Sequence, residues 1–120
     1  MQDFKQLKVW EKSHRLVLSI YKATAKFPRD ELYGLTSQMR RASASISANI
    51  AEGCGRSGGA DFARFLHIAM SSASELEYHL LLAWDLRLLS GSAYAQLAGD
   101  VTEVKRMLTS LIQKLNPHRG

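Results

Sequence analysis

Four histidines are the side chains best suited to acid–base or metal chemistry in this sequence of 120 residues. His14, His67, His79 and His118 are scattered along the chain, and no two of them form a ligand pair of recognised spacing. Glu75 and His79 are four residues apart, whereas the helical di-iron motif requires glutamate and histidine at positions i and i+3. The spacing therefore predicts no metal site, and we expect His79 to be a polar helix residue that bonds to Glu75.

Cys54 lies in the glycine-rich segment GCGRSGG, residues 53–59, where a nearby helix N-terminus would lower its pKa. No histidine base is adjacent, so an incidental loop thiol is favoured over a nucleophile. The segment lacks the lysine and hydroxyl residue of a phosphate-binding P-loop, although Arg56, Ser57 and free helix amides remain a weaker alternative for holding an RNA phosphate. Without a nucleophile and base, the sequence predicts no enzyme, no catalytic residue and no cofactor.

Positive charge is a stronger signal than any catalytic pattern. Sixteen lysines and arginines against eleven acidic residues give a net charge of +5 and a pI near 9.6, which favours polyanionic partners. Several cations share one face of the first expected helix, and two more follow near the start of the second. The candidate nucleic-acid-binding residues are Lys8, Lys12, Arg15, Lys22, Arg40 and Arg41.

Two alternatives weaken that assignment. A charged stripe is often only the solvated side of an amphipathic helix, and Arg40 and Arg41 could pair with Glu52 or with acidic residues of the third expected helix. Asn49 and Glu52 lie on or beside an apolar seam, so we expect structural roles, with hydrogen bonds to the linker before the second helix or to a facing arginine.

Apolar residues recur every three or four positions over four segments, which predicts an all-α fold. We expect helices at about 7–26, 35–53, 60–90 and 92–115, within a single domain spanning 1–120. Pro28 should end the first helix and Gly53 the second. Helices of this length with short connections favour an antiparallel up-down four-helix bundle.

The carboxyl half of the third expected helix, HLLLAWDLRLL, is apolar on nearly every side. A single bundle seam cannot cover that much apolar surface, so part of it should meet another subunit. We expect the oligomer interface to include Leu81, Leu82, Trp84 and Leu88.

The amino terminus has no continuous apolar core of signal-peptide length, and no run reaches the roughly 18 apolar residues of a membrane span. A single cysteine fits a reducing compartment. These features predict a cytoplasmic protein with no membrane partner.

Several sequence strings together resemble one known family. The combination of VW, FP..E.YGL, Q.RRA and NIAEG, within residues 4 to about 90, resembles the four-helix bundle proteins encoded in bacterial large-subunit rRNA intervening sequences. The resemblance extends to the accessory variability determinants of diversity-generating retroelements. It implies a ring-like homopentamer, and for the accessory determinants a basic surface that binds reverse transcriptase and RNA.

Together, the residues and the resemblance predict an oligomeric RNA-binding bundle that contacts phosphates through its cations. The alternative is a protein-interaction scaffold that docks a partner such as a reverse transcriptase. A nuclease is the third possibility, although no cluster of carboxylates or histidine base is evident to support it.

Overall fold

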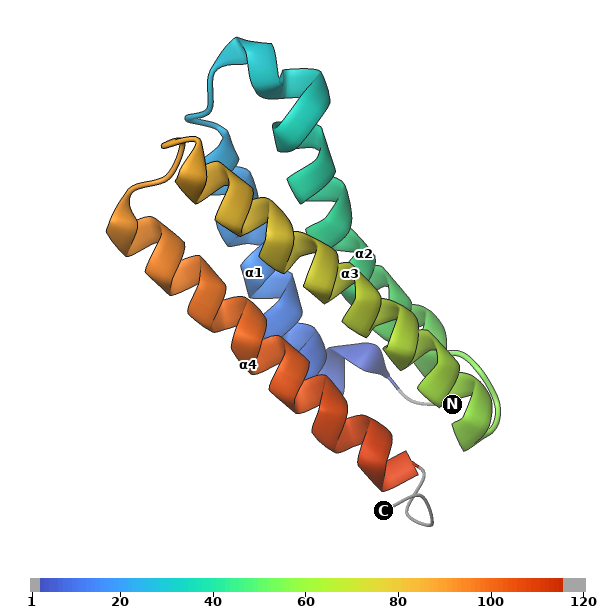
Figure 1. The fold of residues 1–120 in the computed structure, drawn as a ribbon. Helices are drawn as coiled ribbons and strands as arrows, with labels where there is room; N and C mark the ends of the chain where they lie inside the picture. The colour runs from blue at the N-terminus through green and yellow to red at the C-terminus, as the bar shows by residue number, and fades with distance from the viewer. Residues whose placement is uncertain (1–2, 116–120) are drawn as a thin grey trace.

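The computed structural model describes residues 3–115, which form four α-helices and no strand. The helices are α1 (Lys8–Thr24), α2 (Ser37–Cys54), α3 (Gly59–Asp85) and α4 (Gly91–Leu115). They lie side by side along the long axis of an elongated molecule of 45 × 24 × 20 Å (Figure 1). Both α1 and α3 contact α2 and α4, so the four helices surround one core. The predicted all-α, four-helix fold is confirmed.

The predicted apolar seams form the core because residues three and four apart share one face of a helix. α2 and α3 follow the predicted pattern closely. In α1, the three-and-four spacing from Trp10 predicts that Val17 is buried, and the structure buries Leu16 instead. The largest side chains with almost no exposure are Leu16, Ile20, Met39, Ile46, Ile50, Leu66, Leu76, Leu80 and Leu108. No helix in residues 3–115 is long and apolar enough to cross a membrane.

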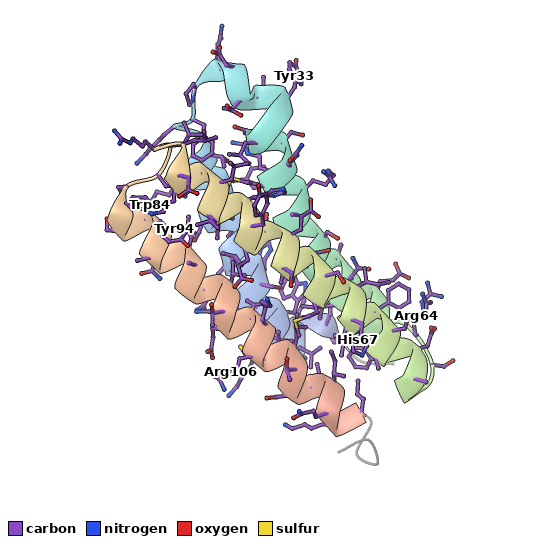
Figure 2. The ribbon with its side chains drawn as sticks, in the orientation of Figure 1. Tyr33, Arg64, His67, Trp84, Tyr94 and Arg106 are labelled. Atoms are coloured by element: carbon purple, nitrogen blue, oxygen red, sulfur yellow. The ribbon has the colours of Figure 1, made fainter. Side chains whose placement is uncertain are left out.

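The connection between α1 and α2 is partly helical. Pro28 precedes a 3₁₀ turn, η2 (Arg29–Glu31), and a π-helical turn, η3 (Leu32–Thr36), leads into α2. Gly34 interrupts the helical backbone there, with φ −108° and ψ −112°. The interruption lets η3 bend away from the bundle axis and leaves Tyr33 on an outer corner of the fold (Figure 2).

The third helix is shorter than predicted, ending at Asp85 instead of continuing to about residue 90. Arg87 adopts the left-handed conformation, with φ 62°. The amide of Leu88 then donates to the carbonyl of Ala83 (2.8 Å) and that of Arg87 to Trp84 (2.9 Å), the hydrogen-bond pattern of a Schellman ending. The three-and-four spacing of the third expected helix, continued from Leu80 and Ala83, predicts Arg87 on the apolar seam, but Arg87 is exposed in the turn. No glycine lies at this ending, and the apolar pattern continues beyond it, so the prediction from that pattern placed the end of the helix too late.

Candidate nucleic-acid interface

Six basic residues without a carboxylate partner in residues 3–115 gather at one end of the bundle. This end carries the α1–α2 and α3–α4 connections (Figure 1), and we call it the cationic end. Its basic residues are Lys22, Lys26, Arg29, Arg40, Arg41 and Arg87. All but Arg40 are exposed, and none belongs to any of the ion pairs formed within the described chain. Free cations at neighbouring positions can each neutralise one phosphate of a polyanion.

Arg40 is held in place by its neighbours. Its Nε donates to Thr24 Oγ1 at 2.9 Å, and its Nη2 donates to the carbonyl of Tyr21 at 3.4 Å. The guanidinium also lies over the Tyr21 ring, with its carbon 4.5 Å from the ring centroid. Thr24 in turn donates to Ile20 in α1, so Arg40 ties the start of α2 to the end of α1. The sequence left open a pairing of Arg40 with Glu52 or with an acidic residue of α3, and neither pair forms within residues 3–115.

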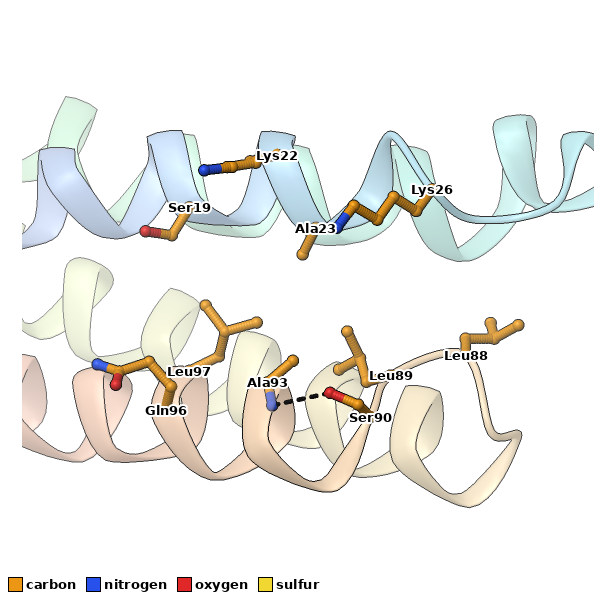
Figure 3. Close-up of a pocket in the computed structure, with 10 residues that line it drawn as sticks. All are labelled: Ser19, Lys22, Ala23, Lys26, Leu88, Leu89, Ser90, Ala93, Gln96 and Leu97. Atoms are coloured by element: carbon orange, nitrogen blue, oxygen red, sulfur yellow. Dashed lines mark hydrogen bonds between the residues drawn. The ribbon is translucent and has the colours of Figure 1, made fainter.

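Lys22 and Lys26 flank a cleft of about 400 Å³ between the end of α1 and the start of α4 (Figure 3). Leu88, Leu89 and Leu97 form its apolar side. Within the cleft, the amide of Ala93 donates to Ser90 Oγ at 3.1 Å, which caps the start of α4. The cleft therefore places two free ammonium groups beside an apolar surface on the cationic end.

The other predicted binding residues are not grouped with these. Lys12 pairs with Asp100 of α4 at 3.4 Å, and Arg15 pairs with Glu11 at 2.7 Å within α1. Lys8 is exposed but lies at the far end of α1, beside the carboxyl half of α4. The structure thus places Lys22, Arg40 and Arg41 at the cationic end, with Lys22 beside one pocket and the two arginines beside another, and leaves Lys8, Lys12 and Arg15 elsewhere along the molecule.

Three basic residues of the cationic end, and the neighbouring Tyr33, were missing from the sequence-based candidates. Lys26 follows Lys22 by one turn on the first expected helix, and Arg29 lies in a connection that carries no periodic signal. The periodic signal placed Arg87 on the seam of the third expected helix, and the structure places it in the turn after α3. Tyr33 is an aromatic residue in a predicted linker, and its 93% exposure shows that the fold does not use it for packing. An aromatic residue next to loop cations was the available signal for this part of the surface.

The two predicted structural polar residues bond locally, not across to the linker or to a facing arginine as expected. Asn49 donates to the carbonyl of Ser45 at 2.9 Å and to its hydroxyl at 3.1 Å. Glu52 is exposed and pairs with Arg56 one turn later, at 2.9 Å. Besides the contacts of Arg40, a polar link between α1 and α2 comes from Ser13 and Ser47, whose buried hydroxyls are 2.9 Å apart.

The glycine-rich connection shows no activated thiol. Cys54 is only 2% exposed at the end of α2. Burial, and secondarily the carboxylate of Asp3, raises the pKa of the Cys54 thiol, the opposite of what a nucleophile needs. Arg56, the candidate phosphate ligand here, pairs with Glu52 and lies over the Phe65 ring at 4.8 Å.

The apolar carboxyl half of α3 is only partly covered. Leu81 is 43% exposed and Trp84 41% exposed, while Leu82 and Leu88 are half-buried. Trp84 stacks on Tyr94 of α4 with ring centroids 5.6 Å apart (Figure 2), so packing within the chain covers part of this apolar surface. The remaining exposed apolar side chains leave a surface on α3 that another molecule could cover.

His79 of α3 is buried without full hydrogen bonding. Its Nδ1 has no partner in residues 3–115, and its Nε2 is 3.6 Å from Glu75 Oε2, longer than the hydrogen bond expected from the sequence. Burial lowers the pKa of His79; the Glu75 carboxylate opposes this effect, and the Arg41 guanidinium adds to it. No group of three or more histidine, cysteine or acidic residues in the described chain is arranged to hold a metal.

The lowered pKa of His79 predicts a pH-dependent stability. Below an unfolded pKa of about 6.5 the unfolded chain takes up a proton that the folded chain resists, so the free energy of unfolding should fall as the pH drops from 7 to 5. Urea unfolding at both pH values measures this loss. In a His79→Gln variant the loss should be smaller, and an equal loss in both proteins would contradict the assignment.

The fold and this surface define a class: a small all-α protein whose described residues form four helices with a cationic end. The chain belongs to the family of 23S rRNA-intervening sequence proteins, whose model matches residues 5–110. This match confirms the sequence resemblance to the rRNA intervening-sequence proteins.

A solved structure supports the assignment. The chain is similar to a crystal structure from Bacteroides thetaiotaomicron, described as a protein of unknown function from the S23 ribosomal protein family. The TM-score is 0.79 with 30% sequence identity, and the match covers 88% of this chain and 98% of that one. Among curated protein sequences there is no match.

Proposed function

We propose that this protein is a non-enzymatic, cytoplasmic RNA-binding protein that contacts RNA phosphates through its cationic end. The observation that carries the proposal is that six cations without a carboxylate partner in residues 3–115 gather at one end of the bundle. Lys12, Arg15, Arg56, Arg64, Lys105 and Arg106 each lie within ion-pair distance of a carboxylate, whereas those of the cationic end have no such partner in residues 3–115. These cations can exchange condensed counterions for contacts with phosphate without first breaking a protein ion pair. Lys5, Lys8 and Lys114 also have no carboxylate partner in residues 3–115, but they lie outside the cationic end.

Family membership is consistent with this role. The family is described by its association with the intervening sequences of 23S rRNA, and the solved relative carries the description of a ribosomal protein family. Family and fold do not by themselves supply a function, so the argument for RNA rests on the free cations.

We further propose an antiparallel up-down bundle that assembles into a ring-like homo-oligomer, a homopentamer by the family resemblance. Short connections and contacts between α4 and both α1 and α3 support the up-down order. The exposed apolar side chains of α3, Leu81 and Trp84 among them, support self-association. A ring would repeat the cationic end once per subunit and increase avidity for an extended RNA.

Purification under two salt conditions tests the proposal. Protein isolated at low salt should carry nucleic acid that absorbs at 260 nm and is removed by ribonuclease but not by deoxyribonuclease. The same preparation in high salt should lose it, because phosphate contacts weaken steeply with salt. Protein that is free of RNA at low salt and does not bind added RNA would contradict the proposed function.

The exposed apolar surface of α3 favours a second candidate, a scaffold that docks a partner protein such as a reverse transcriptase. In that case the cations would serve solubility, and RNA would be captured only when the partner is present. Binding of RNA by the purified protein alone separates the two candidates.

A further inference from the structure

A pocket beside the cationic end combines aromatic, cationic and hydroxyl groups. It has a volume of about 430 Å³, within the usual range for small-molecule sites, and lies between the end of α1, η3 and the start of α2. Tyr21, Tyr33, Arg40 and Arg41 line it, and Thr36 and Ser37 add hydroxyls. No carboxylate is part of this lining. The combination of aromatic rings and guanidinium groups suits a ligand that has both a flat ring and a negative charge.

The contacts of Arg40 within the chain fix its guanidinium group on one side of this pocket. Arg40 is fixed over the Tyr21 ring by its contacts to Thr24 and to the Tyr21 carbonyl, at 2.9 and 3.4 Å. These contacts use Nε and Nη2, and no hydrogen bond within residues 3–115 uses Nη1. A guanidinium held in this way loses little conformational freedom when it meets a phosphate or a base edge.

Tyr33 and Arg41 supply the exposed part of the pocket. The Tyr33 side chain is 93% exposed at the corner formed by η3 (Figure 2), so its ring faces can accept a stacking partner. Arg41 is exposed and lacks a carboxylate partner in the described chain. Unpaired RNA bases stack on aromatic rings in this manner, whereas bases within a duplex are already stacked and unavailable.

We infer that this pocket binds one unpaired nucleotide of an RNA chain, with its base stacked on Tyr33 and its phosphate contacted by Arg41. The inference rests on the proposed RNA-binding function and deepens it. It makes the protein a reader of single-stranded RNA, such as a loop or an end, with the remaining cations of the cationic end holding the flanking phosphates.

The test compares a single-stranded RNA with a perfect RNA duplex of the same length and sequence. Wild-type protein should bind the single strand more tightly, and Tyr33→Ala should weaken single-strand binding roughly tenfold while leaving duplex binding unchanged. Tyr33→Phe is the matched control because it keeps the ring, and it should bind as the wild type does. Since the Tyr33 side chain is almost fully exposed, all three proteins should unfold at similar temperatures.

A second readout reports stacking itself. A single-stranded RNA carrying 2-aminopurine should change its fluorescence on binding to the wild type and to Tyr33→Phe, but less on binding to Tyr33→Ala. Equal binding of single strand and duplex, with no effect of Tyr33→Ala, would overturn the inference while leaving RNA binding intact. Failure of the wild type to bind either RNA would instead reject the proposed function.

Discussion

Replacing Lys22, Lys26, Arg29 and Arg41 together by glutamine is expected to weaken RNA binding roughly 10²-fold at 0.15 M salt. Each of these exposed cations neutralises one phosphate in the proposed complex, and removing one such cation at this salt concentration reduces affinity about fourfold. Arg40 is retained in the variant because it ties α2 to α1. Fluorescence anisotropy with a labelled RNA measures the reduction in affinity.

The matched control removes the same formal charge from paired arginines. Arg15, Arg56, Arg64 and Arg106 each have a carboxylate partner, and Arg64 and Arg106 lie away from the cationic end (Figure 2). Replacing these four by glutamine should reduce affinity by less than about tenfold, because only the screened long-range attraction changes. Equal reductions in both variants would mean that net charge, and not the cationic end, governs binding.

Changing Leu81 to aspartate is expected to convert the proposed oligomer to monomers at micromolar concentration. Leu81 is 43% exposed in the single chain, so the folded subunit can accommodate the carboxylate. Within an apolar interface the same carboxylate would be buried without a partner, which should raise the dissociation constant at least about a hundredfold. Sedimentation velocity of wild type and variant measures the effect.

Leu18→Asp is the control for this change. Leu18 is 57% exposed on α1, outside the expected interface on α3, and its replacement should leave the oligomer intact. A wild-type protein that sediments as a compact monomer would contradict self-association. If Leu18→Asp dissociates the oligomer and Leu81→Asp does not, the interface lies on α1 and not on α3.

Much of the fold could be predicted because buried helix faces leave a regular trace in the sequence. The seam of α3, from Leu66 through Leu76 to Ala83, is buried as its spacing indicated. The pattern failed where backbone geometry decides the outcome. The left-handed Arg87 ends α3 early although apolar residues continue beyond it, and nothing in the spacing marks that change.

The candidate site was harder to predict because a charge stripe does not show which cations are already paired. Lys12 and Asp100 are far apart in sequence, so their contact depends on how α1 packs against α4. Arg29 and Arg87 join the site only because two separate connections meet at one end of the bundle (Figure 1). The helical period was enough to predict Lys22 as a candidate, whereas Arg29 and Arg87 could be assigned to the same end only from the tertiary fold.

The salt dependence of RNA affinity tests most directly whether the cationic end contacts phosphates. A plot of the logarithm of the binding constant against the logarithm of salt concentration has a slope set by the number of phosphates that the protein neutralises. The slope of the variant lacking Lys22, Lys26, Arg29 and Arg41 should be shallower than that of the wild type by about 3 for single-stranded RNA. Parallel slopes for the two proteins would show that these cations do not bind phosphate and would contradict the account.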